Sequence, residues 1–325
     1  METKRLILRP WREEDAQSLF EYAGDPRVGP IAGWPPHTGV ENSREIICTV
    51  LSAPETYAVC LKEDNIAIGS IGLMIGEKSW LRLPENEGEI GYWIGVPFWG
   101  RGLIPEAVRE LQRRAFVELR LETLWCGYFI GNERSRRVQE KCGFVYDHTR
   151  DEVYCAMLNE TRTENVTRLT RQRWLDCFTM RPLEETEQDQ ALALAWKVFL
   201  RYEAPDYAPE GTEEFRRCLH NEQFLAGIAY YGAFYGDALV GLIGIRAKEG
   251  HICFFFVDGP YHRLGIGTRL LSRMRQDHPD RITLNSSPYG VPFYRALGFT
   301  ADGQEQTVNG IRFTPMHMDQ VSGSA

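Results

Sequence analysis

The sequence lacks the features that mark several classes of protein. None of its apolar runs approaches the roughly 20 residues needed to span a bilayer. The first ten residues, METKRLILRP, contain charges and a proline where a signal peptide has an apolar core. The eight cysteines form no CxxC pair, so the usual zinc and thiol-redox motifs are missing. We therefore expect a cytoplasmic protein with free thiols, no bound metal and no membrane partner.

Basic residues are not in excess either. The chain has 37 Lys and Arg against 45 Asp and Glu, which gives a formal net charge of −8. This balance argues against a nucleic-acid partner and slightly favours a cationic acceptor such as an amine, although acidity of this size is common in soluble proteins. The chain does have 325 residues, 43% of them hydrophobic, which is enough for two domains with separate cores.

One stretch combines a strand, a glycine turn and the start of a helix. The apolar run Phe254–Val257 suits a buried strand, Gly265 and Gly267 lie in a tight loop, and a helix opens at Thr268. Such a turn directs several backbone N–H groups at one point, and the helix dipole adds partial positive charge. The arrangement suits a phosphate or diphosphate, although many strand–loop–helix joints need glycine for the turn alone.

The same pattern occurs twice, which favours a functional interpretation. The segment from Glu89 to Gly102 has the same order of strand, proline, aromatic residue and glycine loop. Its residues Pro97, Phe98 and Gly102 match Pro260, Tyr261 and Gly265. After a helix and another strand, each copy also has a Gly-Phe pair, Gly143-Phe144 and Gly298-Phe299.

These residues resemble a known family. His262–Gly267, followed by Phe293–Phe299, resembles the acetyl-CoA signature of the GNAT family of N-acetyltransferases. The family has Arg or Gln where this chain has His262, but backbone amides bind the phosphates, so the departure matters little. The first copy resembles the branch that acetylates the alanine of ribosomal proteins, in Thr3–Arg9, Trp99–Gly102 and Asn132–Ser135.

The resemblance implies two GNAT folds in tandem, with acetyl-CoA as co-substrate and no metal. In that fold the fourth and fifth strands separate, and the pantetheine arm enters between them. The residues that would bind acetyl-CoA are Ile94, Gly100, Arg101, Gly102, Leu103 and Asn132 in the first copy, and Val257, His262, Arg263, Leu264, Gly265, Ile266, Gly267, Thr268 and Asn285 in the second.

The order of elements predicts an α/β protein with mixed sheets covered on both faces. We expect domains at 1–175 and 176–325, since Phe178–Leu183 restarts the pattern of Leu6–Pro10. The Gly- and Pro-rich segment 27–40 is predicted to be a loop, Val153–Leu158 the closing strand of the first domain, and Val321–Ala325 disordered.

Acetyl transfer needs stabilisation of an oxyanion and a proton for the leaving thiolate. The backbone N–H groups of Ile94 and Val257 are candidates for the first task. Tyr294 is the candidate acid, four residues before Gly298, where the family has its tyrosine. A tyrosine merely packed under the sheet is the alternative.

The first half departs from this pattern. Gln139 fills the position of the tyrosine, and the resemblance points to Ser135 as the substitute, because a hydroxyl can donate to a thiolate. An ordinary serine at a helix start is the alternative.

The base is less well specified. Glu89 lies on the fourth strand of the first half, and the second half offers Glu203, Asp206 or His251. Each of these is also readily explained as a solvated surface group. Trp34 and His37 lie where the resembled family lines its acceptor pocket, although an exposed connection explains them equally well.

Three functions fit these observations. The first is an acetyl-CoA-dependent N-acetyltransferase, in which a primary amine of a protein N-terminus or a small molecule attacks directly in a ternary complex. In the second, one half is catalytic and the other is a degenerate structural partner. The third is a non-catalytic acyl-CoA-binding sensor. A tandem chain can itself imitate a two-fold dimer, so both a monomer and a homodimer are compatible with the sequence.

Overall fold

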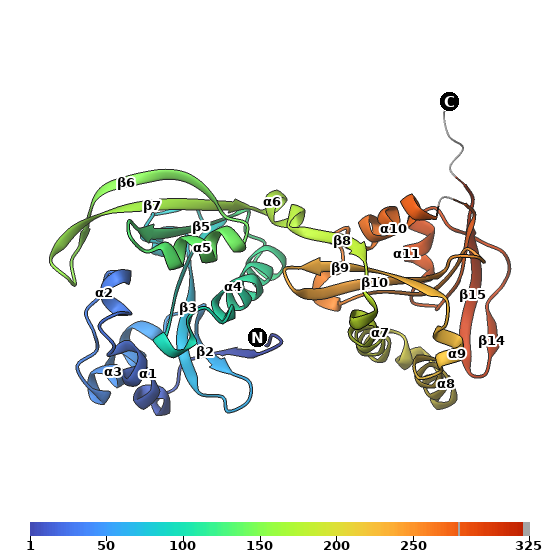
Figure 1. Cartoon of the computed structure of the whole chain (residues 1–325), viewed down its shortest axis with the longest axis horizontal. Coiled ribbons are helices and arrows are strands. Elements are labelled where there is room, and N and C mark those ends of the chain that lie inside the picture. Colours follow the sequence, from blue (N-terminus) through green and yellow to red (C-terminus); the bar gives the residue numbers. More distant parts are fainter. Residues whose placement is uncertain (279, 321–325) are drawn as a thin grey trace. The chain divides into compact units, whose positions relative to one another are not determined.

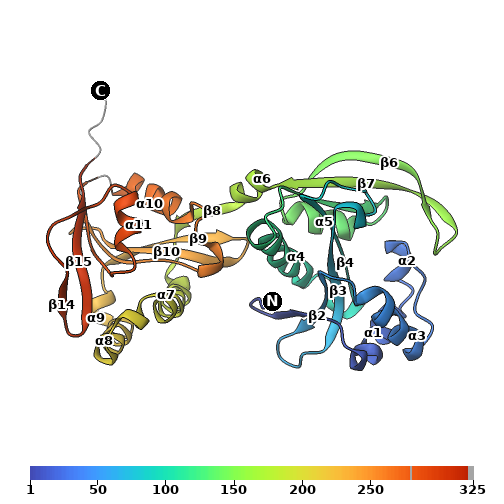
Figure 2. The same ribbon diagram turned by 180° about the vertical axis from the view of Figure 1, so that it is seen from behind.

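The computed structural model describes residues 1–278 and 280–320, and the chain divides into two compact units. Unit 1 is Met1–Cys177 and unit 2 is Phe178–Ala325. Each contains one mixed sheet with helices on its faces (Figures 1 and 2), as the order of elements predicts. Within the described part of the chain, no helix combines the length and apolarity needed to cross a membrane. The prediction of a disordered tail at 321–325 lies outside the described residues.

Unit 1 contains a seven-stranded sheet in the order β1-β2-β3-β4-β5-β7-β6, in which β4 and β5 are parallel and the other neighbours are antiparallel. Its strands are β1 (Leu6–Arg9), β2 (Thr56–Leu61), β3 (Ala67–Ile75), β4 (Glu87–Ile94), β5 (Thr123–Phe129), β6 (Val145–Cys155) and β7 (Glu160–Thr170). Its helices are α1 (Ala16–Ala23), α2 (Gly29–Ala32), α3 (Val40–Ile46), α4 (Leu103–Arg113), α5 (Glu133–Lys141) and α6 (Arg171–Asp176).

The start of unit 1 follows its hydrophobic pattern. Leu6 and Leu8 of β1 are buried, and α1 buries Ala16, Leu19 and Ala23 at helical spacing. These residues pack with Trp11 into the core beneath the first helices. A fully buried Leu contributes on the order of 2 kcal/mol relative to an exposed one, so this stripe is enough to hold α1 on the sheet.

Two predictions for unit 1 are wrong. The expected closing strand Val153–Leu158 is part of a long hairpin, because β6 and β7 are 11 residues each. Their polar, alternating sequence gives little apolar signal, and the ladder between them fixes the fold instead. The segment 27–40 is not all loop, since it contains α2. Figures 1 and 2 show the hairpin reaching over to α2, where the Arg162 guanidinium donates to the Pro30 carbonyl at 2.6 Å.

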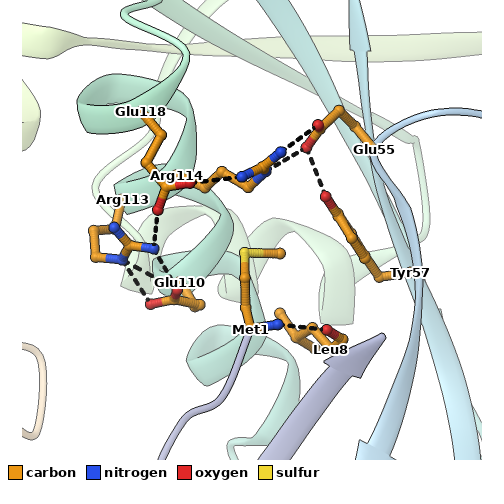
Figure 3. Close-up of polar contacts among 8 residues, drawn as sticks. All are labelled: Met1, Leu8, Glu55, Tyr57, Glu110, Arg113, Arg114 and Glu118. Atoms are coloured by element: carbon orange, nitrogen blue, oxygen red, sulfur yellow. Dashed lines mark hydrogen bonds and ion pairs between the residues drawn. The ribbon is translucent and has the colours of Figure 1, made fainter. Parts of the chain in front are cut away.

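The C-terminal end of α4 is tied to the sheet by ion pairs (Figure 3). Arg114 donates through Nε and Nη2 to the two carboxylate oxygens of Glu55 on the turn before β2, each at 2.6 Å. Tyr57 donates to the same carboxylate at 2.8 Å, and Arg113 pairs with Glu110 and Glu118. A bidentate guanidinium–carboxylate pair fixes orientation as well as distance. The helix whose N-terminus follows the first glycine loop is therefore held firmly at its other end.

Unit 2 contains an eight-stranded sheet in the order β13-β15-β12-β11-β10-β9-β8, with β14 paired to β15, and only β11 and β12 are parallel neighbours among the described strands. Its strands are β8 (Phe178–Pro182), β9 (Ile228–Tyr235), β10 (Ala238–Arg246), β11 (His251–Val257), β12 (Ile282–Ser286), β13 (Thr300–Ala301), β14 (Gln306–Val308) and β15 (Ile311–Met318). Its helices are α7 (Gln188–Tyr202), α8 (Pro209–Leu219), α9 (Glu222–Leu225), α10 (Ile266–Asp277) and α11 (Val291–Ala296).

Each unit has its own ion pair between its first strand and its first helical turn, and we call this ion pair a clasp. In unit 1, Arg9 pairs with Asp15 through two bonds of 2.6 and 2.7 Å. In unit 2, Arg181 pairs with Glu187 through bonds of 2.7 and 2.6 Å. Each carboxylate also accepts from the backbone N–H three residues earlier, at Arg12 and Glu184. The repeat in the sequence is therefore a repeat in structural detail.

Candidate active site

In each unit the strand before the glycine loop separates from its parallel neighbour. Strands β4 and β5 pair from Glu87 with Thr123 to Glu89 with Trp125, although β4 continues to Ile94. In unit 2, β11 pairs with β12 only at His251 and Ile252, and it continues to Val257. Both units therefore leave one edge of the long strand unpaired near its carboxyl end.

The last residue of each long strand directs its backbone toward that unpaired edge. The N–H of Gly95 donates to Ile68 of β3, and the N–H of Asp258 donates to Val240 of β10, both at 2.8 Å. Backbone groups alternate in direction along a strand. The N–H groups of Ile94 and Val257 therefore point to the opposite side, where a ligand can pair with them as a further strand would.

The carbonyl of that residue is occupied by a ring five positions later. The indole Nε1 of Trp99 donates to the Ile94 carbonyl at 2.9 Å, and the imidazole Nε2 of His262 lies 2.7 Å from the Val257 carbonyl. Because a carbonyl only accepts, His262 must carry its proton on Nε2. The sequence analysis matched the neighbouring residues of the two loops but did not find this contact, which gives His262 a task other than phosphate binding.

The two glycine loops have the same backbone. Gly100 and Gly102 have φ of 74° and 72°, and Arg263 and Gly265 have φ of 62° and 73°. In each loop two left-handed residues flank one ordinary residue, and Gly102 and Gly265 are the N-caps of α4 and α10. The free N–H groups of each first helical turn follow directly. A Cβ at Gly100 or Gly265 would meet nothing within 4 Å, so the space above both loops is open.

The expected phosphate-loop residues therefore lie at two helix N-termini. Gly100, Arg101, Gly102 and Leu103 precede and open α4, and Arg263, Leu264, Gly265, Ile266, Gly267 and Thr268 do the same for α10. In unit 1, Arg5 of the N-terminal segment pairs with Glu106 of α4 at 2.7 Å and donates to the Arg101 carbonyl at 2.9 Å. This pair neutralises the carboxylate in the first turn of α4.

Ser135 lies in a chain of hydrogen-bonding side chains in unit 1. Its Oγ is 3.0 Å from the hydroxyl of Tyr92 and 3.2 Å from Nε2 of Gln139. Thr167 donates to Oε1 of Gln139 at 2.7 Å, and the Asn132 side chain caps α5 by accepting from the Ser135 N–H at 3.2 Å. Burial raises the pKa of Tyr92 well above its ordinary value, so this phenol stays protonated.

Tyr92 was missed by sequence reasoning. Its signal lies in strand alternation, because it stands two residues before Ile94 and faces α5. Gln139 is buried and hydrogen-bonded, so at the position where unit 2 has Tyr294 it supports Ser135.

Tyr294 of unit 2 stands among aromatic rings. Its ring centroid is 5.8 Å from Phe255, 5.3 Å from Phe293 and 5.6 Å from Phe299. Burial raises its pKa well above the usual range, and the negative charge of Glu203 acts in the same direction. The phenol therefore keeps its proton over the whole physiological pH range.

Glu89 is buried on the other face of β4. Its carboxylate accepts from the Ser79 hydroxyl at 2.6 Å and from the backbone N–H groups of Trp80 and Leu81. Burial raises its pKa, and these hydrogen bonds oppose the rise. Glu164 of β7 also has a pKa raised by burial, with the charge of Glu89 adding to it. Two carboxyl groups that disfavour each other's ionisation thus lie on one face of the sheet.

An aromatic wall continues that face. Trp34 lies 5.8 Å from Trp93 of β4 and 5.5 Å from His37, measured between ring centroids. The Nδ1 of His37 is 2.8 Å from the Ser43 hydroxyl, and burial lowers the pKa of this histidine. The segment after α2 therefore packs against the strand that carries Glu89, and it is more than an exposed connection.

The remaining predicted residues of unit 2 are dispersed. His251 is at the beginning of β11, at the opposite end from Val257, with its Nδ1 2.9 Å from the Thr283 hydroxyl. Asn285 is exposed in β12 and Asp206 is exposed after α7. Glu203 alone among the three base candidates acts electrostatically on Tyr294. No group of three or more His, Cys, Asp or Glu suited to a metal occurs among residues 1–278 and 280–320.

Comparisons with known proteins identify the family to which both units are similar. Two family models match the chain, each described as an acetyltransferase (GNAT) domain, one over residues 5–145 and one over residues 203–320. The uncharacterized N-acetyltransferase p20 of Bacillus licheniformis is 31% identical over 128 residues, which are 38% of this chain and 68% of that protein. YdaF of Bacillus subtilis (strain 168), provisionally named a ribosomal N-acetyltransferase, is 44% identical over 71 residues, 22% of this chain and 39% of that protein.

Among solved structures, a GNAT-family acetyltransferase from Bacillus anthracis aligns with 53% of this chain and 98% of its own, at 22% identity and a TM-score of 0.47. The two family matches together extend over most of both units, and p20 is matched over more than two thirds of its length. The chain therefore belongs to the GNAT acetyltransferase family, has two of its domains in tandem, and is an N-acetyltransferase.

Proposed function

We propose that both units bind acetyl-CoA and transfer its acetyl group to a primary amine by direct attack in a ternary complex. The observation that carries this proposal is the duplicated geometry of strand end and glycine loop. Each loop has two left-handed residues and an open space above it, and it is followed by the N-terminus of a helix of at least 11 residues. That combination fits a diphosphate.

Backbone groups would hold the co-substrate. The diphosphate would lie against the amides from Arg101 to Leu103 in unit 1 and from Leu264 to Thr268 in unit 2. The pantetheine arm would pair with the open edges of β4 and β11, where Ile94 and Val257 present N–H groups. The same N–H groups are suited to the charge that develops on the acyl oxygen. Asn132 and Asn285 stand at the far side of each wedge, near the ends of β5 and β12.

The bound thioester supplies an activated acetyl group, and the side chains of the chain move the protons. As the new N–C bond forms and the C–S bond breaks, the ammonium proton has to leave and the thiolate has to gain one. Tyr294 would give its phenolic proton to sulfur in unit 2. Ser135 would donate to sulfur in unit 1, supported by Tyr92 and Gln139. Glu89 would accept the ammonium proton in unit 1, directly or through water.

The acceptor proposed for unit 1 is a cationic amine. Glu89 supplies a carboxyl group on one face, near the Glu164–Arg150 ion pair of 3.1 Å, and Trp93 and Trp34 supply the aromatic surface next to it. Aromatic rings beside carboxylates suit an ammonium group with an apolar neighbour. Both a peptide N-terminus and a small amine fit this description, and the name of the relative YdaF favours the N-terminus of a ribosomal protein.

We further propose a cytoplasmic protein that acts as a monomer or homodimer, without a metal and with neither a nucleic-acid nor a membrane partner. The eight cysteines are free thiols, which supports a reducing compartment. The net charge of −8 supports an amine in preference to a nucleic acid.

Calorimetric titration of the full chain with acetyl-CoA tests the proposal, together with thiol release measured against a panel of amines and peptides with free N-termini. We expect two binding sites and release that depends on the acceptor. A single binding site would favour one catalytic unit with a degenerate structural partner. Binding without turnover of any acceptor would favour a sensor, and no binding at all would contradict the proposal.

A further inference from the structure

Unit 2 lacks the strand carboxylate that unit 1 offers as a base. Counting along the matched loops, the position of Glu89 is taken in β11 by Ile252, which is buried. The positions of Gly91 and Trp93 are taken by Phe254 and Phe256. Phe215 of α8 stacks edge-on against both rings, at 6.3 and 5.9 Å. This face of β11 is filled by the core, so a carboxylate for unit 2 has to come from another element.

Helix α7 ends at the open edge between β11 and β12. Tyr202, its last residue, contacts His262 of the glycine loop in a tilted arrangement at 4.9 Å and stacks on Tyr289 beyond β12 at 5.5 Å. Its hydroxyl lies against Gly259, where a Cβ would come within 2.0 Å of it. The next residue is Glu203, whose N–H still bonds to the Phe199 carbonyl at 2.9 Å. The end of α7 therefore contacts residues on both sides of the opening between β11 and β12, which would admit the pantetheine arm.

The Glu203 carboxyl group meets the segment after β12. It accepts a hydrogen bond from the hydroxyl of Ser287, which directly follows that strand. Ser287 in turn accepts from the N–H of Gly290 at 3.2 Å. A Cβ at Gly290 would lie 3.4 Å from the Ser287 hydroxyl and 3.0 Å from a ring carbon of Tyr294. The carboxyl of Glu203 and the ring of Tyr294 are thus neighbours across one glycine.

We propose that Glu203 is the general base of unit 2 and takes a proton from the ammonium group of the acceptor. Tyr294 is the general acid, which keeps its phenolic proton until it gives it to the sulfur. This inference rests on the proposed function. The lone pair freed on the amine nitrogen forms the new bond to the acyl carbon, and the C–S bond breaks as Tyr294 protonates the sulfur. The nitrogen then loses its second proton, which restores the phenol of Tyr294, and the proton on Glu203 passes to solvent, so that one proton is released in each turnover. The two units would then perform one reaction with carboxylates from different elements.

The surroundings of Glu203 suit this task. Burial raises its pKa to about 7, and the bond from Ser287 opposes the rise. The titratable groups that face it are Tyr207 from its own turn and Tyr289 and Tyr294 from the segment after β12, and each has a raised pKa and stays neutral near pH 7. Of the charged residues nearby, Arg263 acts on Tyr289, and Arg312 and Asp206 act on Tyr207. A base is most effective when its pKa lies near the working pH.

The test uses the full chain with unit 1 silenced by Glu89→Gln and Ser135→Ala. Thiol release from acetyl-CoA is followed from pH 5 to 9 with spermidine, phenethylamine and an alanyl peptide as probes. We expect Glu203→Gln to lower kcat at neutral pH by about 10²-fold and to remove the rise in rate through pH 7. Glu203→Asp should keep a rise. The matched control is Asp206→Asn, an exposed acid three residues away, which should leave the profile unchanged.

Binding separates the possible failures. Calorimetry with acetyl-CoA should give the same affinity for unit 2 with and without Glu203→Gln. If binding persists and the pH profile of the Gln variant equals that of its parent, the base assignment is overturned while the proposed function stands. If unit 2 binds no acetyl-CoA, both fall. If no probe is acetylated, infrared titration of the carboxyl groups decides, because a Glu203 carboxyl that ionises below about pH 5 overturns the assignment.

Discussion

Strands β4 and β11 occupy equivalent places, but they present different side chains on their equivalent faces. Strand β4 presents Glu89, Gly91 and Trp93, and a Cβ at Gly91 would meet only the terminal methyl of Met74 at 3.9 Å. Strand β11 presents Ile252, Phe254 and Phe256, and both phenylalanine rings pack into the core of unit 2. The backbone that would bind the co-substrate is thus the same, while the faces available to an acceptor differ. If both units accept an amine, side-chain size on this one strand would be enough to give them different acceptor sites.

The opposite faces of these strands differ as well. Tyr92 of β4 contacts Ser135 by a hydroxyl, and Phe255 of β11 contacts Tyr294 by its ring. Unit 1 therefore surrounds its candidate donor with hydrogen bonds, and unit 2 surrounds its donor with rings. Because an aromatic ring without a hydroxyl cannot replace a lost phenol as a proton donor, we expect unit 2 to be the more sensitive of the two to a single substitution.

The largest effect is expected for Tyr294→Phe. Removing the phenol should lower kcat of unit 2 by about 10²-fold, because no proton is then delivered to the thiolate. The affinity for acetyl-CoA should not change. Thiol release in a chain with Glu89→Gln and Ser135→Ala measures the effect. Because the pKa of Tyr294 is raised, the loss should be uniform across the physiological range, and unchanged turnover at every pH would remove Tyr294 from the reaction.

The matched substitution in unit 1, Ser135→Ala, should have a smaller effect, about tenfold. The Tyr92 hydroxyl lies 3.0 Å from Ser135 Oγ and can replace part of its function. The double variant Ser135→Ala, Tyr92→Phe should then lose more activity than the two single effects combined. Additive losses would contradict a shared donor network. Turnover is measured with unit 2 silenced by Tyr294→Phe.

The difference between the acceptor faces can be tested by giving β4 the residue of β11. Gly91→Phe should reduce kcat/KM for the amine in unit 1 by at least about tenfold, since the ring covers the face between Glu89 and Trp93. Acetyl-CoA binding is the internal control and should persist, because the open edge and the loop are untouched. Gly91→Ala, which adds one methyl, should change little. Equal losses for Ala and Phe would indicate a backbone effect instead of a filled acceptor face.

The glycine loops are expected to tolerate less than their flanks. Gly265→Val places a β-branched residue at φ 73° and should weaken acetyl-CoA binding in unit 2 by about 5- to 30-fold, from a conformational cost of about 1–2 kcal/mol. Arg263→Gly should keep or improve binding, because arginine already holds a left-handed conformation there. Gly303→Val, at an open position elsewhere in unit 2, is the control. If the affinity for acetyl-CoA survives Gly265→Val, the loop serves only as a turn.

Much of the fold could be predicted from the sequence because apolar periodicity and glycine positions are local signals, and both halves of the chain contain them. The strand that ends at Val257, the turn at Gly265 and the helix after it are local features. The β6–β7 hairpin could not be predicted, since its strands are held by long-range ladder bonds between polar residues such as Thr149 and Asn165. Local patterns carry no information about such pairing.

The candidate site divides in the same way. Ser135 and Tyr294 follow from their distance to a motif, and their roles remain proposals. Tyr92, Trp99 and the bond from His262 to the Val257 carbonyl depend on which way a side chain points after the chain has folded. The pKa of Glu203 is raised by burial in the folded unit, and the Ser287 hydroxyl that opposes this rise comes from a distant part of the sequence. Sequence spacing alone contains neither direction nor burial.

The smallest effects are expected at the clasps between first strand and first helix, where the two units again differ. The side chains of Arg9 and Asp15 are both 10% exposed, whereas those of Arg181 and Glu187 are 43% and 22% exposed. Asp15→Ala leaves a guanidinium buried with only Asn65 and backbone oxygen as partners, and should destabilise unit 1 by about 3 kcal/mol. Glu187→Ala removes a partner from a solvated guanidinium and should destabilise unit 2 much less than Asp15→Ala destabilises unit 1. Hydrogen exchange of peptides from β1–β2 and β8–β9 measures each unit separately, and equal losses of protection would show that burial does not set the strength of this duplicated pair.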